Sequence, residues 1–457
     1  MARSSPSVAG TARPDWLVQF GRRLLLARGR AGLTQQALGA PDLSKSFISL
    51  LESGRSHPSV ETVIALARRV GSSIGALLLD TPALRLETAQ NLVHLAGQMD
   101  PGPQGAEAVT LVEAARVLLP DMPADLRVRA ALVRARVAMA GGRLDEAARW
   151  AEEALTQARR HRLTNLAGMG LALKGDVALK QRSFKAALPL LEEATTTLQR
   201  TKSARTEENV RALISLGAAC FQLGLTDRAG RAYKRALEVA TRLRLQALGG
   251  KALMGLGLVA RARRQADLAV SLLRQAHEAF AQADQVAEAG QALNALGLVL
   301  REQGRHQEAL AALEQALQLR DRLESPGVRS ATLDEIALVH LALGRHADAA
   351  RAARRAIREA EAARDRGREA AAQVTLARVL RARGRRREAV HLLRGAITVL
   401  MRLGLDQQAK AAAADLGLLL RDAGNQQDAE KYLAMALRKS PAPASARQAP
   451  ALEELPH

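Results

Sequence analysis

The sequence "LNALGLVLREQGRHQEALAALEQAL" at residues 293–317 decides the fold of most of this chain. Apolar residues fall at helical spacing on both sides of "EQGRH", which predicts two helices joined by a short turn. Within this stretch, Gly297 is followed by Gly304 and then by Ala309 and Ala316. Small side chains let adjacent helices approach closely, so this spacing predicts a tightly packed helix pair.

The same pattern recurs along the chain with a period of about 40 residues. Its loop position is occupied in steps of 40, 42, 40, 40, 40, 40 and 40 by Gly142, Arg182, Gly224, Arg264, Gly304, Gly344, Gly384 and Gly424. Two alanines follow each loop, from Ala147 with Ala154 to Ala429 with Ala436. Because repetition at a fixed period is typical of solenoids, we expect an all-α protein with eight helix pairs over residues 124–439.

These small-residue positions resemble the tetratricopeptide repeat. The resemblance rests on Gly217, Gly257, Gly297 and Gly417 in the first helices and on the paired alanines in the second. The sequence departs from that family in its period, which exceeds the usual length of about 34 residues, and in its few aromatic residues. We therefore expect helices that are longer by about one turn than in that family. The width of the groove that the repeats form does not follow from the sequence.

The segments that flank the repeats are less regular. Residues 84–123 contain Ala96, Ala108 and Ala115 in the expected relation but carry the turn "DPGPQG", so we interpret them as a degenerate capping repeat. Residues 440–457 are rich in Pro and Ala and lack apolar periodicity, which predicts a disordered tail. We also expect residues 1–14 to be disordered.

Residues 15–80 do not follow the repeat and are predicted to form five short helices. Thr34 and Ser44 stand where an N-cap hydroxyl would accept hydrogen bonds from free backbone amides. Gly32 and Gly54 stand where the preceding helices would end. Five short helices with these boundaries favour a compact DNA-binding domain.

The order "LTQQAL…LSKSFISLLESGRSHPSVETV…LARRVG" resembles the Cro-repressor-like helix-turn-helix family. The resemblance implies that the helix beginning near residue 45 enters the major groove of DNA, with base edges, a thymine methyl and phosphates as its contacts. The DNA-binding residues that it implies are Gln35, Ser44, Lys45, Ser46, Ser49, Leu50 and Arg55.

Two further features of this domain follow from the resemblance. It implies a buried ion pair of Arg28 with Glu52 that braces the helices. The turn between Leu38 and Ser44 is one residue shorter than the family usually has and contains Gly39 and Pro41. We therefore expect a different tilt of the recognition helix.

The positive charge of the chain lies mostly outside this domain. The formal net charge is +21, to which residues 1–80 contribute +5, the repeats +17 and residues 440–457 −1. Resemblance to tetratricopeptide arrays places the first helix of each pair along a concave groove, which we expect to be polar, mostly positive and lined by solvent-facing side chains. Such a groove suits a peptide, an acidic partner or an anionic ligand. Its predicted ligand-binding residues are Arg211, Lys251, Gln291, Asn294, Arg301, Asp334 and Arg378, together with Arg261, Arg381 and Arg421.

Several classes of protein are disfavoured. The one cysteine, Cys220, excludes a disulfide framework within the chain and is expected in the core. The single cysteine fits a reducing compartment, so we expect a cytoplasmic protein. The sequence has no uninterrupted run of roughly 18 apolar residues, so we expect no membrane span. The strings "HEAF", "GLGLVA" and "GGK" each lack residues that a zinc, dinucleotide or phosphate site needs. We therefore expect no metal, no cofactor and no enzyme activity.

The combination of these two regions resembles bacterial transcriptional regulators that respond to peptide pheromones. It implies a DNA-binding regulator, expected as a homodimer that reads two half-sites of double-stranded DNA. The alternative is an interaction scaffold in which the repeats recruit an acidic protein and the small domain does not bind specific DNA. Sequence-specific retention of DNA distinguishes the two.

Overall fold

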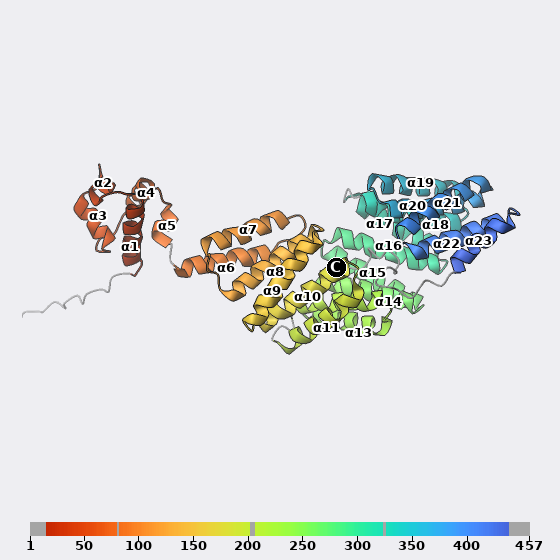
Figure 1. Ribbon diagram of the computed structural model, residues 1–457, viewed down its shortest axis with the longest axis horizontal. Helices are drawn as coiled ribbons and strands as arrows, with labels where there is room; N and C mark the ends of the chain where they lie inside the picture. Colours follow the sequence, from red (N-terminus) through yellow and green to blue (C-terminus); the bar gives the residue numbers. More distant parts are fainter. Residues whose placement is uncertain (1–14, 80–81, 202–205, 323–325, 438–457) are drawn as a thin grey trace, which may run out of the picture. The chain divides into compact units, whose positions relative to one another are not determined.

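The computed structural model describes residues 15–79, 82–201, 206–322 and 326–437 (Figure 1). The predicted disordered segments, 1–14 and 440–457, lie outside these residues. Every element in the described part of the chain is an α-helix, which confirms the all-α prediction. The chain forms two compact units, residues 1–133 and 134–457, which we describe separately.

The first unit begins with the predicted five short helices. They are α1 (Asp15–Arg30), α2 (Gln35–Gly39), α3 (Lys45–Glu52), α4 (Val60–Arg69) and α5 (Ile74–Leu79). Their apolar sides meet in one core made of Phe20, Leu24, Leu38, Ile48, Leu51, Val63, Leu66, Ala67, Val70 and Leu77. A core of this size can hold a short helix such as α3 in place, although a helix of its length is unstable alone.

Local chemistry fixes the boundaries of these helices as predicted. The hydroxyl of Thr34 accepts a hydrogen bond from the backbone N–H of Ala37 at 3.1 Å, and that of Ser44 accepts one from Phe47 at 3.1 Å. Gly54 ends α3 with a φ of +63°, which glycine adopts without steric cost. The position and start of the recognition helix therefore follow from its own sequence.

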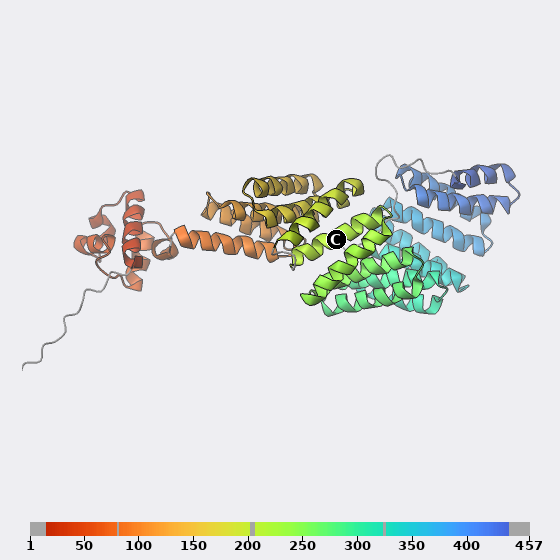
Figure 2. The ribbon, with the colours of Figure 1, turned by 90° about the horizontal axis from the view of Figure 1, so that it is seen from below.

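The remaining helices follow the 40-residue period. After α6 (Pro82–Gln98) and α7 (Gly105–Leu118), they run in order as α8 (Ala124–Ala140), α9 (Leu144–Arg160), α10 (Thr164–Lys180), α11 (Phe184–Arg200), α12 (Glu207–Gln222), α13 (Thr226–Arg242), α14 (Gln246–Ala262), α15 (Ala266–Gln282), α16 (Val286–Glu302), α17 (His306–Asp321), α18 (Pro326–Ala342), α19 (His346–Ala362), α20 (Arg366–Ala382), α21 (Arg386–Arg402), α22 (Asp406–Arg421) and α23 (Gln426–Leu437). Even-numbered helices from α10 to α22 each contact the next even-numbered helix, and Figure 2 shows the helix pairs of the second unit side by side. The first helices of successive repeats therefore share one continuous surface.

The recurring loop position has a physical cause. All eight residues at this position have a positive φ, between +58° at Arg264 and +79° at Gly424. The turn is closed by a backbone hydrogen bond such as that from the Arg305 N–H to the Leu300 carbonyl, 2.9 Å. Glycine recurs here because other residues adopt this left-handed conformation only at an energetic cost.

Small residues in the first helices allow close packing, as predicted. A Cβ atom on Gly297 would lie 2.5 Å from Cγ of Leu313, and one on Gly257 would lie 2.8 Å from Cγ of Leu273. In each case the second helix of the pair inserts a large side chain against the bare backbone of the first. Cys220 is also buried in this unit, as expected of a core residue.

Candidate functional site

The recognition helix α3 presents a polar outer face. Lys45, Ser46 and Ser49 are exposed, and Leu50 beside them is 43% exposed. On the opposite side, Ile48 and Leu51 are fully buried in the core. The structure thus brings four of the predicted base-contacting residues together on one accessible surface, while the apolar stripe anchors the helix.

A buried carboxylate holds this helix against its neighbours. Oε1 of Glu52 accepts a hydrogen bond from Nε of Arg28 at 2.5 Å, which confirms the predicted pair. Oε2 of Glu52 accepts one from Nε2 of Gln35 at 2.7 Å. Arg28 also donates to the carbonyl of Leu33 at 2.8 Å. The amide nitrogen of Gln35 therefore serves the brace, and its contact with phosphate stays a prediction.

Arg69 is a positioning residue that the sequence interpretation missed. Its Nη1 donates to the carbonyls of Leu38 and Gly39 at 3.1 Å each, and its Nη2 donates to Oδ2 of Asp42 at 2.6 Å. These bonds tie α4 to the end of α2 and to the turn that precedes α3. An arginine in the last turn of a helix usually has a solvated side chain, so its sequence position alone did not single it out.

The predicted ligand-binding residues lie on the first helices α12, α14, α16, α18, α20 and α22. Three of their cations pair with carboxylates one repeat further on: Lys251 with Glu288 at 3.8 Å, Arg301 with Glu335 at 2.9 Å and Arg378 with Asp415 at 2.7 Å. Other pairs on these helices are Arg211 with Glu207, Arg261 with Glu302, and Arg381 with Asp422. We call these six pairs the ion-pair ladder.

The ladder corrects two expectations about the groove. The groove was expected to carry mostly positive charge, but each of these six cations has a carboxylate partner. The side chains were expected to face solvent, but Asn294 is only 2% exposed and the side chain of Lys251 is 14% exposed. The reason is that the first helices of successive repeats contact each other, so side chains between them lose access to water.

Two of the acidic partners, Glu335 and Asp415, could have been found by applying the period to polar residues. In four of the repeats a polar residue stands nine positions before the loop position. These residues are Ser215, Glu335, Thr375 and Asp415. These positions share one face of the first helices with the predicted cations. The predicted ligand-binding residues include one acid, Asp334, but none of these four.

Two aspartates on first helices, Asp176 on α10 and Asp334 on α18, are partly buried, and their Oδ1 atoms are shielded from solvent. Burial raises the pKa of Asp334 to about 7, against the opposing effects of a hydrogen bond from Thr375 and the charges of Arg378 and Arg301. Burial likewise raises the pKa of Asp176 to about 6, opposed by Ser215 and by nearby cations. Oδ1 of each aspartate is buried without a hydrogen-bond partner among the described residues. Both groups therefore titrate near neutral pH.

The described residues hold no group of three or more His, Cys, Asp or Glu side chains that could bind a metal ion. Within the same residues, no helix has both the length and the apolar character that crossing a membrane requires.

Two kinds of known family match different parts of the chain. Residues 19–78 match a family described as "Helix-turn-helix domain". Two families are both described as "Tetratricopeptide repeat". Residues 250–322 and 288–362 match the first, and residues 172–242 and 374–444 match the second. No curated protein matches the chain. The chain therefore combines a helix-turn-helix domain with tetratricopeptide repeats, as its sequence predicted.

Solved structures are similar in fold at low sequence identity. The apo form of RapI is 13% identical, with a TM-score of 0.61 over 77% of this chain and 96% of its own. The apo form of the quorum sensor NprR from B. thuringiensis is 15% identical, with a TM-score of 0.60 over 77% of this chain and 97% of its own. A Rap protein complexed with Competence and Sporulation Factor is 15% identical, with a TM-score of 0.56 over 78% of this chain and 96% of its own.

Proposed function

We propose that this protein is a sequence-specific, DNA-binding transcriptional regulator whose repeat groove binds a controlling ligand. The observation that carries the proposal is the outer face of α3, where Lys45, Ser46 and Ser49 are exposed on a helix that a buried ion pair holds in place. A short, rigidly positioned helix with a polar outer face suits the major groove of DNA.

Each exposed residue of this face has a role in the proposal. Lys45, Ser46 and Ser49 contact base edges, and Leu50 contacts a thymine methyl group. Phosphates are contacted by Gln35, by the N-terminus of α3 at Ser44 and by Arg55, which is exposed directly after α3. Base contacts supply sequence specificity, whereas phosphate contacts supply affinity that depends on salt.

We propose that the protein binds DNA as a homodimer. One helix of this length reads too few base pairs to define an operator. Two domains on half-sites one helical turn apart, roughly 34 Å, would read twice as many. Light scattering at the concentrations used for DNA binding tests this directly: a monomer that protects a single half-site contradicts the dimer.

The proposed ligand is a peptide or an acidic partner in the repeat groove. Support comes from the likeness of fold to a quorum sensor and to a Rap protein in complex with a factor. In this chain the residues proposed to bind are Arg211, Lys251, Gln291, Asn294, Arg301, Asp334 and Arg378. Of these, Asn294 is the least accessible and would need a change in repeat packing to reach a ligand.

The ladder suggests how such a ligand would act. Arg301 on α16 pairs with Glu335 on α18, so this ion pair links two successive repeats. A ligand carboxylate that pairs with Arg301 in place of Glu335 breaks this ion pair between the two repeats. Glu335 is then free to pair with another cation. Because a ligand shifts regulation only through different affinities for two arrangements, exchange of such pairs is a suitable switch. We further propose a cytoplasmic, non-enzymatic protein, since its target is DNA and its groove is a binding surface.

Selection from a pool of random duplexes by the full-length protein tests the proposed function. We expect enrichment of an inverted repeat whose half-sites are about one helical turn apart. The protein with Lys45→Ala and Ser49→Ala should enrich this sequence more weakly. If the unaltered protein also enriches none, the proposal fails.

A further inference from the structure

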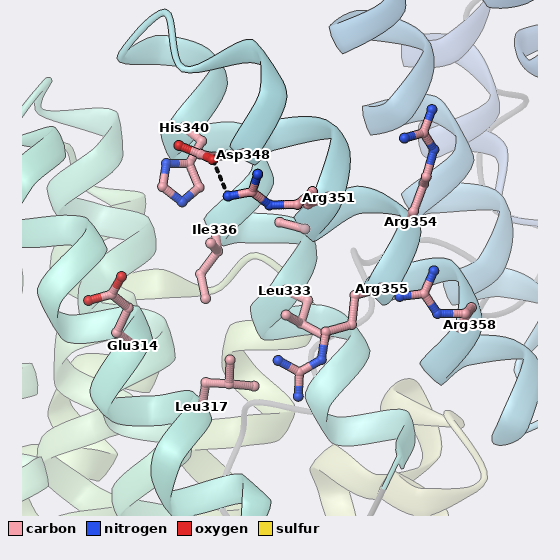
Figure 3. A pocket seen from close by; sticks show the side chains of 11 residues that line it. Glu314, Leu317, Leu333, Ile336, His340, Asp348, Arg351, Arg354, Arg355 and Arg358 are labelled. Carbon is pink, nitrogen blue, oxygen red and sulfur yellow. Dashed lines mark hydrogen bonds and ion pairs between the residues drawn. The ribbon is translucent and has the colours of Figure 1, made fainter.

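An open pocket lies outside the groove, between the second helices of two successive repeats. Its volume is about 660 Å³, and it is lined by residues of α17, α18 and α19 (Figure 3). The floor is apolar and is made by Leu317, Leu333 and Ile336. Figure 3 shows Arg351 and Arg355 reaching over this floor, while Arg354 points away from it.

Basic residues outnumber acidic ones around the pocket. Its lining contains four arginines, all on α19, and two carboxylates, Glu314 and Asp348. The arginines at 351, 354, 355 and 358 follow helical spacing, so they run along one side of α19 over about 10 Å. Such a strip meets several negative charges at once rather than one.

The neighbouring repeat provides an internal comparison. The equivalent pocket one repeat earlier, between α15 and α17, has a volume of about 270 Å³. Where α19 has Arg351, Arg354 and Arg355, the positions 40 residues earlier hold Ala311, Glu314 and Gln315. The apolar frame therefore comes from the repeat itself, whereas the arginines distinguish α19 from α17.

The existing partners of these arginines are easily replaced. Arg351 pairs with Asp348 at 2.5 Å, but its side chain is 77% exposed. Arg355 lies at 3.7 Å from Asp321 and at 3.9 Å from Glu359. Exposed ion pairs of this kind contribute only about 0–1 kcal/mol, so a carboxylate from another molecule can replace them at little cost.

We propose that this pocket binds an acidic segment of a partner protein, with apolar side chains on the floor and carboxylates on the arginines of α19. The apolar floor requires a hydrophobic side chain in the occupant, and the strip of arginines requires more than one acid. A single small acid would satisfy only part of the strip. The site shares no residue with α3 or with the ion-pair ladder, so it does not depend on the proposed function.

A labelled synthetic peptide tests the proposal. The probe is a fluorescein-labelled dodecapeptide in which leucines fall at helical spacing on one face and glutamates fill the other positions. Its binding to the full-length protein is measured by fluorescence anisotropy. Two control peptides replace all glutamates by glutamine or all leucines by serine, because the proposal requires both kinds of contact.

The pocket variant combines Arg351→Ser with Arg355→Ser. Its matched control combines Arg383→Ser with Arg387→Ser, which removes the same charge from exposed positions that do not line the pocket. All the arginines replaced are exposed, so both variants should fold, which circular dichroism verifies. We expect the pocket variant to bind the probe at least tenfold more weakly and the control to bind it within about twofold of the unaltered protein.

Three results would overturn the proposal. The first is that the unaltered protein does not bind the probe, or binds the glutamine peptide equally well. The second is equal loss of binding in the pocket variant and its control, which would indicate general attraction by positive charge. The third is that decanoate displaces the probe and binds more tightly, which would assign the pocket to a small apolar acid.

Discussion

Arg28 and Glu52 are joined by an ion pair in which Nε and Oε1 lie 2.5 Å apart, and the side chain of Glu52 is only 5% exposed. The pair connects α1 with the last residue of α3. A buried carboxylate without a cation is costly, so the position of the recognition helix depends on Arg28. The polar outer face of α3 is thus oriented by a contact on its opposite side.

Loss of this pair should destabilise the DNA-binding domain. We expect Arg28→Ala to lower its free energy of unfolding by about 3–5 kcal/mol, because Glu52 would stay buried without its cation. Arg30→Ala, at an exposed position, should change it by less than about 0.5 kcal/mol. Urea unfolding followed by the fluorescence of Trp16, with Trp150→Phe in all proteins, measures both. Equal midpoints for the two variants would contradict the role of Arg28.

The loop position of the repeat offers a test by exchange of residues. Arg264 has a φ of +58°, whereas Gly304 at the equivalent position has a φ of +75° and leaves space for a Cβ, which would meet no atom within 4 Å. Arg264→Gly should stabilise the array by about 0.5–1 kcal/mol, since left-handed backbone costs a non-glycine residue more than glycine loses in chain entropy. Gly304→Arg should destabilise it by a similar amount.

Urea unfolding of both loop variants, followed by circular dichroism, gives the comparison. Shifts of the two midpoints in opposite directions are expected. Shifts in the same direction would mean that side-chain contacts, and not the backbone conformation, determine which residue stands in the loop.

Much of the fold could be predicted because its causes are local. The left-handed turn selects glycine at positions such as Gly304, and close packing selects small residues such as Gly297, so both leave a period in the sequence. The N-caps Thr34 and Ser44 were predictable for the same reason, since each acts on an amide three residues further along.

The rest could not be predicted because it depends on residues distant in sequence. Arg301 and Glu335 are neighbours only because two repeats stack, and the angle of stacking does not follow from the period. The partners of Arg69 are about 30 residues earlier in the chain. The burial of Asn294 likewise results from the close approach of adjacent first helices. Asn294 was predicted to face solvent, but this packing makes it inaccessible.

The buried Asp334 should make stability depend on pH. Its pKa is raised from 3.8 to about 7, so the folded state holds the proton more tightly than the unfolded state does. Stability is therefore lost as the pH rises from about 4 to about 7. Asp334→Asn should remove this loss and be more stable than the unaltered protein at pH 8, by on the order of a few kcal/mol, but not at pH 4.

Thermal unfolding midpoints between pH 4 and pH 8 check this dependence. Asp145→Asn, at an exposed position, serves as the control and should keep the pH dependence of the unaltered protein. Parallel curves for Asp334→Asn and the unaltered protein would show that Asp334 does not carry the effect.

Arg55 should contribute affinity without specificity. If Arg55 contacts a phosphate, Arg55→Ala weakens binding to all duplexes similarly and lowers the slope of log affinity against log salt by about one unit. Titrations at several salt concentrations, with specific and random duplexes, measure this slope. An unchanged slope with a selective loss for the specific duplex would instead place Arg55 on a base.

The central claim is that α3 reads DNA sequence, and the ratio of affinities for the selected duplex and for a scrambled duplex tests it most directly. The ratio is measured for the unaltered protein and for the variant with Lys45→Ala and Ser49→Ala. We predict that the variant loses about 1–3 kcal/mol of discrimination for each base contact removed, which is roughly fivefold or more per contact. An unchanged ratio would contradict the claim and favour a scaffold whose small domain does not read DNA.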